Sequence, residues 1–115
     1  MDPVQPDPAW RAAMLAAVHG NGLAEATDAL LSLTYHDPDR AWVENILLDV
    51  VADDDIEMQV RSLAITCLGH LARIHREVNR KAVLPVLQDL MQSSAFGGIA
   101  QDALDDIETY ALRSK

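Results

Sequence analysis

The stretch that decides the fold runs from Asp53 to Ile74 and reads DDDIEMQVRSLAITCLGHLARI. Acidic residues typical of a turn come first, and an apolar pattern with helical spacing follows. At 100° per residue these apolar side chains share one stripe, made of Val60, Leu63, Ala64, Cys67, Leu68, Leu71 and Ile74. We expect a helix over residues 56–75 that buries this stripe and turns outward Ser62, Thr66, Gly69, Arg73 and Arg76.

The first half of the chain repeats itself, and each copy opens with a helix start. Asp7-Pro8 and Asp37-Pro38 each place a carboxylate able to cap a helix before a proline suited to the first turn, and Ala-Trp follows both. Superposing the two Ala-Trp pairs also superposes apolar residues further along, namely Met14 on Ile46, Leu15 on Leu47 and Val18 on Val50. The repeated unit is therefore a helical one.

The whole pattern predicts an all-α fold with six helices, over residues 8–19, 23–35, 39–52, 56–75, 80–92 and 98–112. Paired as three stacked antiparallel hairpins, they span residues 8–35, 39–75 and 80–112 of a single domain over 1–115, with a flexible N-terminus at 1–7. Gly20-Asn21-Gly22, Asp53 to Asp55 and Phe96-Gly97-Gly98 supply the turns inside the pairs. Pro85 falls inside the fifth helix, where it is expected to kink the helix without ending it.

The other second-position helices divide into two faces in the same way. The core stripes are expected to hold Leu23, Ala26, Leu30 and Leu33 in the second helix, and Ala100, Ala103, Leu104, Ile107 and Ala111 in the sixth. The reverse face of the sixth helix carries Asp102, Asp105, Asp106 and Thr109. Like charges at these spacings repel, so something is expected to compensate for them. Arg73 of the fourth helix could pair with Asp105 or Asp106, solvent could screen the carboxylates, or a cationic partner could bind them.

Charge and composition narrow the classes of function. A net charge of −9 opposes binding to nucleic acid, because phosphate binding depends on Lys and Arg. The same charge favours a basic protein partner, although it also serves solubility alone. Cys67 is the only cysteine, so no internal disulfide forms, and its place in the core stripe favours a buried hydrophobe over a catalytic thiolate. With no signal peptide and no apolar run of membrane length, we expect a cytoplasmic protein with no membrane partner.

The sequence gives little support for a catalytic or metal-binding function. The histidines show neither an i, i+4 pair nor a zinc-binding run, which argues against a metal site. Asp105 and Asp106 are better explained as a solvated pair than as an acid and a base. The glycine turns follow no strand, so they do not form a phosphate-binding loop. We therefore expect no enzyme activity, no metal and no cofactor.

Several segments resemble those of HEAT-like helical repeat proteins. They are the Val-Arg and Leu-Gly-x-Leu-Ala pattern within 60–72, the segments Asp37-Pro38-Asp39-Arg40-Ala41-Trp42-Val43-Glu44 and Cys67-Leu68-Gly69-His70-Leu71-Ala72-Arg73-Ile74-His75, and the run Ala103-Leu104-Asp105-Asp106-Ile107. The likeness covers roughly 30–110 and is closest to small bacterial immunity proteins of polymorphic or contact-dependent toxin systems. It implies a right-handed α-solenoid that binds and neutralises one cognate toxin, often a cationic nuclease.

In HEAT-like repeats the second helix of each hairpin lines the concave side of the solenoid. The resemblance therefore implies a groove along the outward faces of the second, fourth and sixth helices. We expect partner binding by Asp28, Tyr35, Thr66, Arg73, Asp102, Asp105 and Asp106. Two alternatives stay open: a scaffold or oligomerisation module, and an enzyme similar to the HEAT-like bilin lyases.

Overall fold

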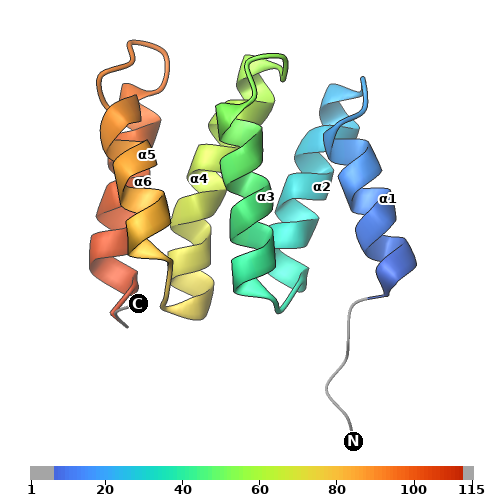
Figure 1. Ribbon diagram of the computed structural model, residues 1–115, viewed down its shortest axis with the longest axis horizontal. Helices are drawn as coiled ribbons and strands as arrows, with labels where there is room; N and C mark the ends of the chain where they lie inside the picture. The colour runs from blue at the N-terminus through green and yellow to red at the C-terminus, as the bar shows by residue number, and fades with distance from the viewer. Residues whose placement is uncertain (1–6, 113–115) are drawn as a thin grey trace, which may run out of the picture.

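The computed structural model describes residues 7–112, and within them the secondary structure is entirely helical (Figure 1). The helices are α1 (Pro8–Val18), α2 (Leu23–His36), α3 (Arg40–Ala52), α4 (Met58–His75), α5 (Arg80–Leu90) and α6 (Gly97–Tyr110). The predicted all-α fold is confirmed, and the six predicted helices match these to within two residues at each end. The flexible segment expected at 1–7 lies, apart from Asp7, outside the described residues.

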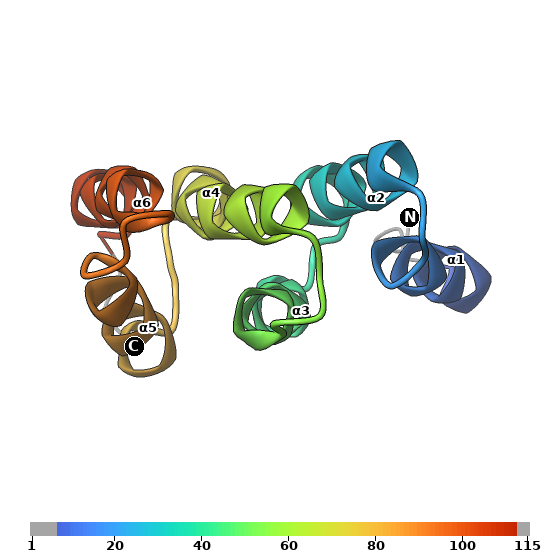
Figure 2. The same ribbon diagram turned by 90° about the horizontal axis from the view of Figure 1, so that it is seen from above.

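The helices form a stack of three hairpins in two layers. Figure 2 shows α2, α4 and α6 side by side in one layer and α1, α3 and α5 in the other. Helix α4 is central, since it packs against α2, α3 and α6. Neighbours in the layer of α1, α3 and α5 stand further apart than those in the layer of α2, α4 and α6 (Figure 2). The predicted stack of antiparallel hairpins is thus confirmed.

The core stripe of α4 is largely as the apolar spacing predicts. Val60, Ala64, Cys67, Leu68 and Leu71 are buried, as are Ile65 and Ala72 on the flanks of the stripe. The wider buried surface follows from the central position of α4, which is covered on three sides and not on one. Ile74, by contrast, was expected in the core and is 41% exposed, because it lies in the last turn of the helix.

Gly69 corrects the predicted outward face of α4. It is buried, and a Cβ built there would lie 2.9 Å from Oδ2 of Asp106 and 3.2 Å from Cα of Ala103. Glycine in the middle of a helix costs about 1 kcal/mol relative to alanine. Because Gly69 has no side chain, α4 and α6 approach each other more closely here than any other residue would permit.

The helix starts also hold one correction. Asp7 caps α1 by accepting a hydrogen bond from the Ala9 N–H (2.9 Å), as predicted, but Asp37 does not cap α3. The cap of α3 is Asp39, whose carboxylate accepts a hydrogen bond from the Trp42 N–H (3.1 Å). The carboxylate of Asp37 is instead engaged by a different helix.

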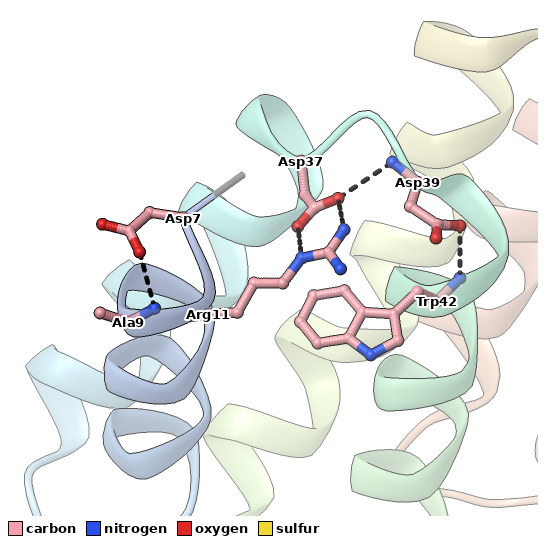
Figure 3. A network of polar contacts seen from close by, with 6 residues as sticks. All are labelled: Asp7, Ala9, Arg11, Asp37, Asp39 and Trp42. Atoms are coloured by element: carbon pink, nitrogen blue, oxygen red, sulfur yellow. Dashed lines mark hydrogen bonds and ion pairs between the residues drawn. The ribbon is translucent and has the colours of Figure 1, made fainter. Parts of the chain in front are cut away.

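Asp37 joins α1 to the connection between α2 and α3 (Figure 3). Its two oxygens accept hydrogen bonds of 2.8 Å each from Nε and an Nη of Arg11, and Oδ1 also accepts from the Asp39 N–H at 2.9 Å. The Arg11 guanidinium lies 4.1 Å from the centre of the Trp42 ring in α3. The Asp37 side chain is fully buried, so these contacts clamp the first hairpin onto the second.

Candidate protein-binding surface

The predicted site residues lie on α2, α4 and α6, the three helices of one layer. Asp28, Tyr35, Arg73, Asp102 and Asp105 are exposed, and Thr66 and Asp106 are partly buried. These helices run in the same direction, because each is the second member of its hairpin (Figure 1). The structure therefore gathers the predicted residues in one layer, and their role in binding stays a prediction.

Tyr35 links α2 to α4 through a residue that the sequence did not single out. Its hydroxyl group is 2.9 Å from Nδ1 of His70, and the two ring centres are 5.5 Å apart. Burial lowers the pKa of His70, with a further lowering from Arg73 and an opposing effect from Asp106, so the ring favours its neutral form. His70 stands at the edge of the core stripe, and a position at such an edge gives no sequence signal for an interhelix contact.

Arg73 links α4 to α6 through the ion pair that the sequence allowed. Its Nη2 and Nε lie 3.1 and 3.3 Å from Oδ1 of Asp106. Its guanidinium is also 5.1 Å from the centre of the Tyr110 ring, a second contact that the sequence did not reveal. Of the two aspartates considered as partners, the structure therefore selects Asp106.

Asp102, Asp105 and Asp106 form an acidic ridge on α6, and the Arg73 ion pair leaves two of these three charges free. Asp105 accepts a hydrogen bond of 2.9 Å from the Gln101 side-chain amide, which is neutral and leaves the negative charge in place. Within residues 7–112 the Asp102 carboxylate makes no hydrogen bond or ion pair. Both side chains are exposed, so they are available to a cation from outside.

In contrast to these free carboxylates, several arginine side chains are paired with other groups of the protein. Arg40 pairs with the buried Glu44 at 2.7 Å. Arg61 donates two hydrogen bonds to the carbonyl oxygen of Val51 near the end of α3, at 3.1 and 2.9 Å. Arg61 thereby joins α4 to α3, whereas Arg40 and Glu44 pair within α3. With a net charge of −9, the field outside the molecule is mainly negative.

The structure also shows where side chains that could act in catalysis or metal binding lie. Cys67 is fully buried, and burial raises the pKa of its thiol to about 11 despite a hydrogen bond with Thr34, as expected of a core side chain. Over residues 7–112 no three His, Cys, Asp or Glu side chains are grouped so that they could hold a metal ion. None of the helices described is both long enough and apolar enough to cross a membrane.

This protein is similar to a known protein in its three-dimensional structure. No protein-family model matches the sequence, and no curated protein is significantly similar to it. A chain in the crystal structure of a CDI complex from Cupriavidus taiwanensis LMG 19424 superposes on this protein with a TM-score of 0.79. The two sequences are 29% identical, and the match covers 96% of this chain and 93% of that chain. The likeness thus extends over the whole hairpin stack.

Proposed function

We propose that this protein is an immunity protein, which binds a cognate toxin domain directly and neutralises it in the cytoplasm of the producing cell. The observation that carries the proposal is the end-to-end structural match to a chain of a CDI complex, at 29% identity. The resemblance of the sequence to HEAT-like immunity proteins of contact-dependent toxin systems points to the same class. The protein would act by occupying the active site or the substrate path of the toxin, with no chemistry of its own.

The charge pattern supports a basic toxin as the partner. The net charge of −9 is accompanied by carboxylates that the fold leaves unpaired, among them Asp102 and Asp105. Complementary charge speeds the encounter of two proteins and disfavours wrong partners. The exposed Tyr35 and Arg73 are of the residue types that most often anchor an interface.

We place the contact surface on α2, α4 and α6, where Asp28, Tyr35, Thr66 and Arg73 lie in the same layer as the α6 ridge. On this surface Asp106 has a different role from its neighbours, because its charge is already neutralised by Arg73 at 3.1 Å. Asp106→Asn is therefore a comparison variant that removes one charge from the same helix at a position paired with Arg73.

The test uses the C-terminal domain of the large secreted toxin that we expect to be encoded beside this protein. Growth of cells expressing that domain, with and without this protein, measures neutralisation, and surface-plasmon resonance measures association at 0.05 and 0.3 M salt. We compare the wild type with Asp102→Asn/Asp105→Asn and with Asp106→Asn. The double variant is expected to associate about tenfold more slowly at low salt and to approach the wild type at high salt.

The outcomes separate the parts of the proposal. Growth that this protein fails to restore, together with the absence of binding, would refute the immunity role. Binding with unchanged association of the double variant would keep the role and remove the ridge from the contact surface. A stable homo-oligomer in light scattering, with no binding of the toxin domain, would favour a scaffold module.

A further inference from the structure

A pocket of about 280 Å³ opens at the end of the stack where the first two hairpins turn. One wall is the connection between α1 and α2, over residues 19–22, and the other is the acidic connection between α3 and α4, over residues 53–57. The pocket lies at the N-terminal ends of α2 and α4, at the edge of the layer that carries the proposed contact surface. Figure 1 shows both of these helix ends at the same end of the stack.

Part of the pocket lining is apolar. Val18, Ala26 and Val60 line it and are buried, and Ile56 lines it and is partly buried. Leu23 also lines it, yet the Leu23 side chain is 40% exposed, although the apolar spacing of α2 assigned it to the core. The fold thus leaves a large aliphatic side chain at the mouth of a pocket, where a ligand would bury it.

The mouth of the pocket is acidic. Asp53, Asp55 and Glu57 line it, and neither lysine nor arginine is among its lining residues. The Asp53 carboxylate accepts a hydrogen bond from the Asp55 N–H at 2.9 Å, but the side chains of Asp55 and Glu57 make no hydrogen bond or ion pair within residues 7–112. Two carboxylates therefore stand free beside an apolar recess.

Within residues 7–112 no lysine or arginine pairs with these two carboxylates. The guanidinium of Arg61 is held by the Val51 carbonyl oxygen and by Asp54 at 3.4 Å. The helix dipoles nearly cancel, because α2 and α4 begin at this end of the stack while α1 and α3 end there. Each helix end amounts to about half an elementary charge, so the full charges of the carboxylates set the sign of the potential.

The geometry points to a docking pocket for one arginine side chain of the protein partner. An arginine has an aliphatic stem that can lie on Val18, Leu23 and Ile56 and a guanidinium that can reach the carboxylates at the mouth. Arginine is hydrated more weakly than lysine and is enriched at interfaces, whereas lysine is depleted there. The volume falls just below the range of about 300–1,000 Å³ usual for small-molecule sites and suits a single inserted side chain.

This inference rests on the proposed function for the identity of the partner, so its test has one part that needs no partner. Isotope-labelled protein is titrated with N-acetyl-arginine methylamide and, as a neutral analogue of the same shape, with N-acetyl-citrulline methylamide. In amide proton–nitrogen spectra, the arginine compound is expected to shift the signals of Gly20, Gly22 and Ile56, and the citrulline compound is not.

The variant Asp55→Asn/Glu57→Gln is expected to lose these shifts. Both side chains are exposed and unpaired, so its melting temperature is expected to match the wild type. The matched control is Asp102→Asn/Asp105→Asn, which removes the same amount of charge from α6 and is expected to keep the shifts. Against the toxin domain, the Kd of the pocket variant is expected to rise about thirtyfold, the loss typical of an interface hot spot.

Each outcome decides between the two proposals. Equal shifts with the arginine and citrulline compounds, or shifts that persist in the pocket variant, would overturn the pocket inference. So would an unchanged Kd of the pocket variant for a toxin domain that the wild type binds, and the immunity role would then stand. Specific binding of the arginine compound without any binding of the toxin domain would keep the pocket and overturn the proposed partner.

Discussion

The substitution Asp37→Asn tests the clamp between the first two hairpins. Asparagine keeps the size of the side chain but replaces one carboxylate oxygen by an NH2 group, which must then face an N–H of Arg11. Of the two 2.8 Å hydrogen bonds to Arg11, one is lost, and the other keeps its charged donor but loses the charge on its acceptor. The Asp37 side chain has no exposed surface in the folded protein, so water cannot replace the lost partner.

A hydrogen bond to a charged group contributes about 1.5–3 kcal/mol, and leaving a buried group unsatisfied adds to its loss. We expect Asp37→Asn to lower the free energy of unfolding by about 3 kcal/mol and the melting temperature by about 10 °C. Asp106→Asn is the control, because it alters an aspartate–arginine pair in which Arg73 is 54% exposed. Its loss is expected to stay below about 1 kcal/mol.

Urea unfolding followed by circular dichroism measures both variants, and acidification gives a second readout. Burial acts to raise the pKa of Asp37, but the hydrogen bonds from Arg11 and the Asp39 N–H outweigh it and lower the pKa below its usual value. The stability contributed by the carboxylate is therefore complete above about pH 4 and is lost as the pH falls through the lowered pKa. Equal losses for the two variants at pH 7, or a gap that does not shrink on acidification, would refute the clamp.

Three further predictions concern one cysteine, two histidines and two glycines. Cys67 is expected not to react with a thiol reagent at pH 8 until urea unfolds the protein, and rapid labelling of the native state would contradict its burial and its pKa of about 11. Burial, aided by nearby arginines, lowers the pKa of His70 and His75. The melting temperature is therefore expected to fall as the pH drops below about 6.5. If a His70→Gln/His75→Gln variant shows the same fall between pH 7.5 and 5.5, these histidines are not the cause. Gly69→Val is expected to destabilise the protein by about 1–3 kcal/mol through contact with the α6 backbone. Gly98→Ala, where a Cβ meets nothing within 4 Å, is expected to stabilise it by about 0.5–1 kcal/mol. Denaturant midpoints in the opposite order would show that α4 and α6 do not approach as described.

The features predicted from the sequence are those that depend on neighbours within one helix. The core stripe of α4 follows from spacing alone, since residues three or four apart share a face, and Leu68 and Leu71 are fully buried as that rule requires. The cap at Asp7 likewise needs only the N–H of Ala9, two residues away. Such interactions are encoded locally, so the sequence pattern is enough to find them.

The features that were missed depend on which helix comes alongside. Asp37-Pro38 has the form of a helix cap, but the carboxylate of Asp37 is taken by Arg11, 26 residues earlier in the chain. Gly69 lies on the small polar face of α4, and only the approach of α6 makes that face an interior one. Leu23 has the spacing of a core residue, but no neighbouring helix covers the first turn of α2 completely. Periodicity identifies an apolar face without saying how far along the helix that face is covered.

The same division between local and long-range contacts explains the charge on the outside of this protein. Arginines are used where helices meet, as Arg11 is at Asp37 and Arg73 at Asp106, so positive charge is drawn into the junctions of the stack. The carboxylates of Asp55 and Asp102 have no such partner and remain at the turn edge and on α6. A basic partner would then meet two distinct features, an acidic ridge that governs the rate of association and an open pocket that governs the rate of dissociation. Charge removed from the ridge is therefore expected to act on association, and charge removed from the pocket on the lifetime of the complex.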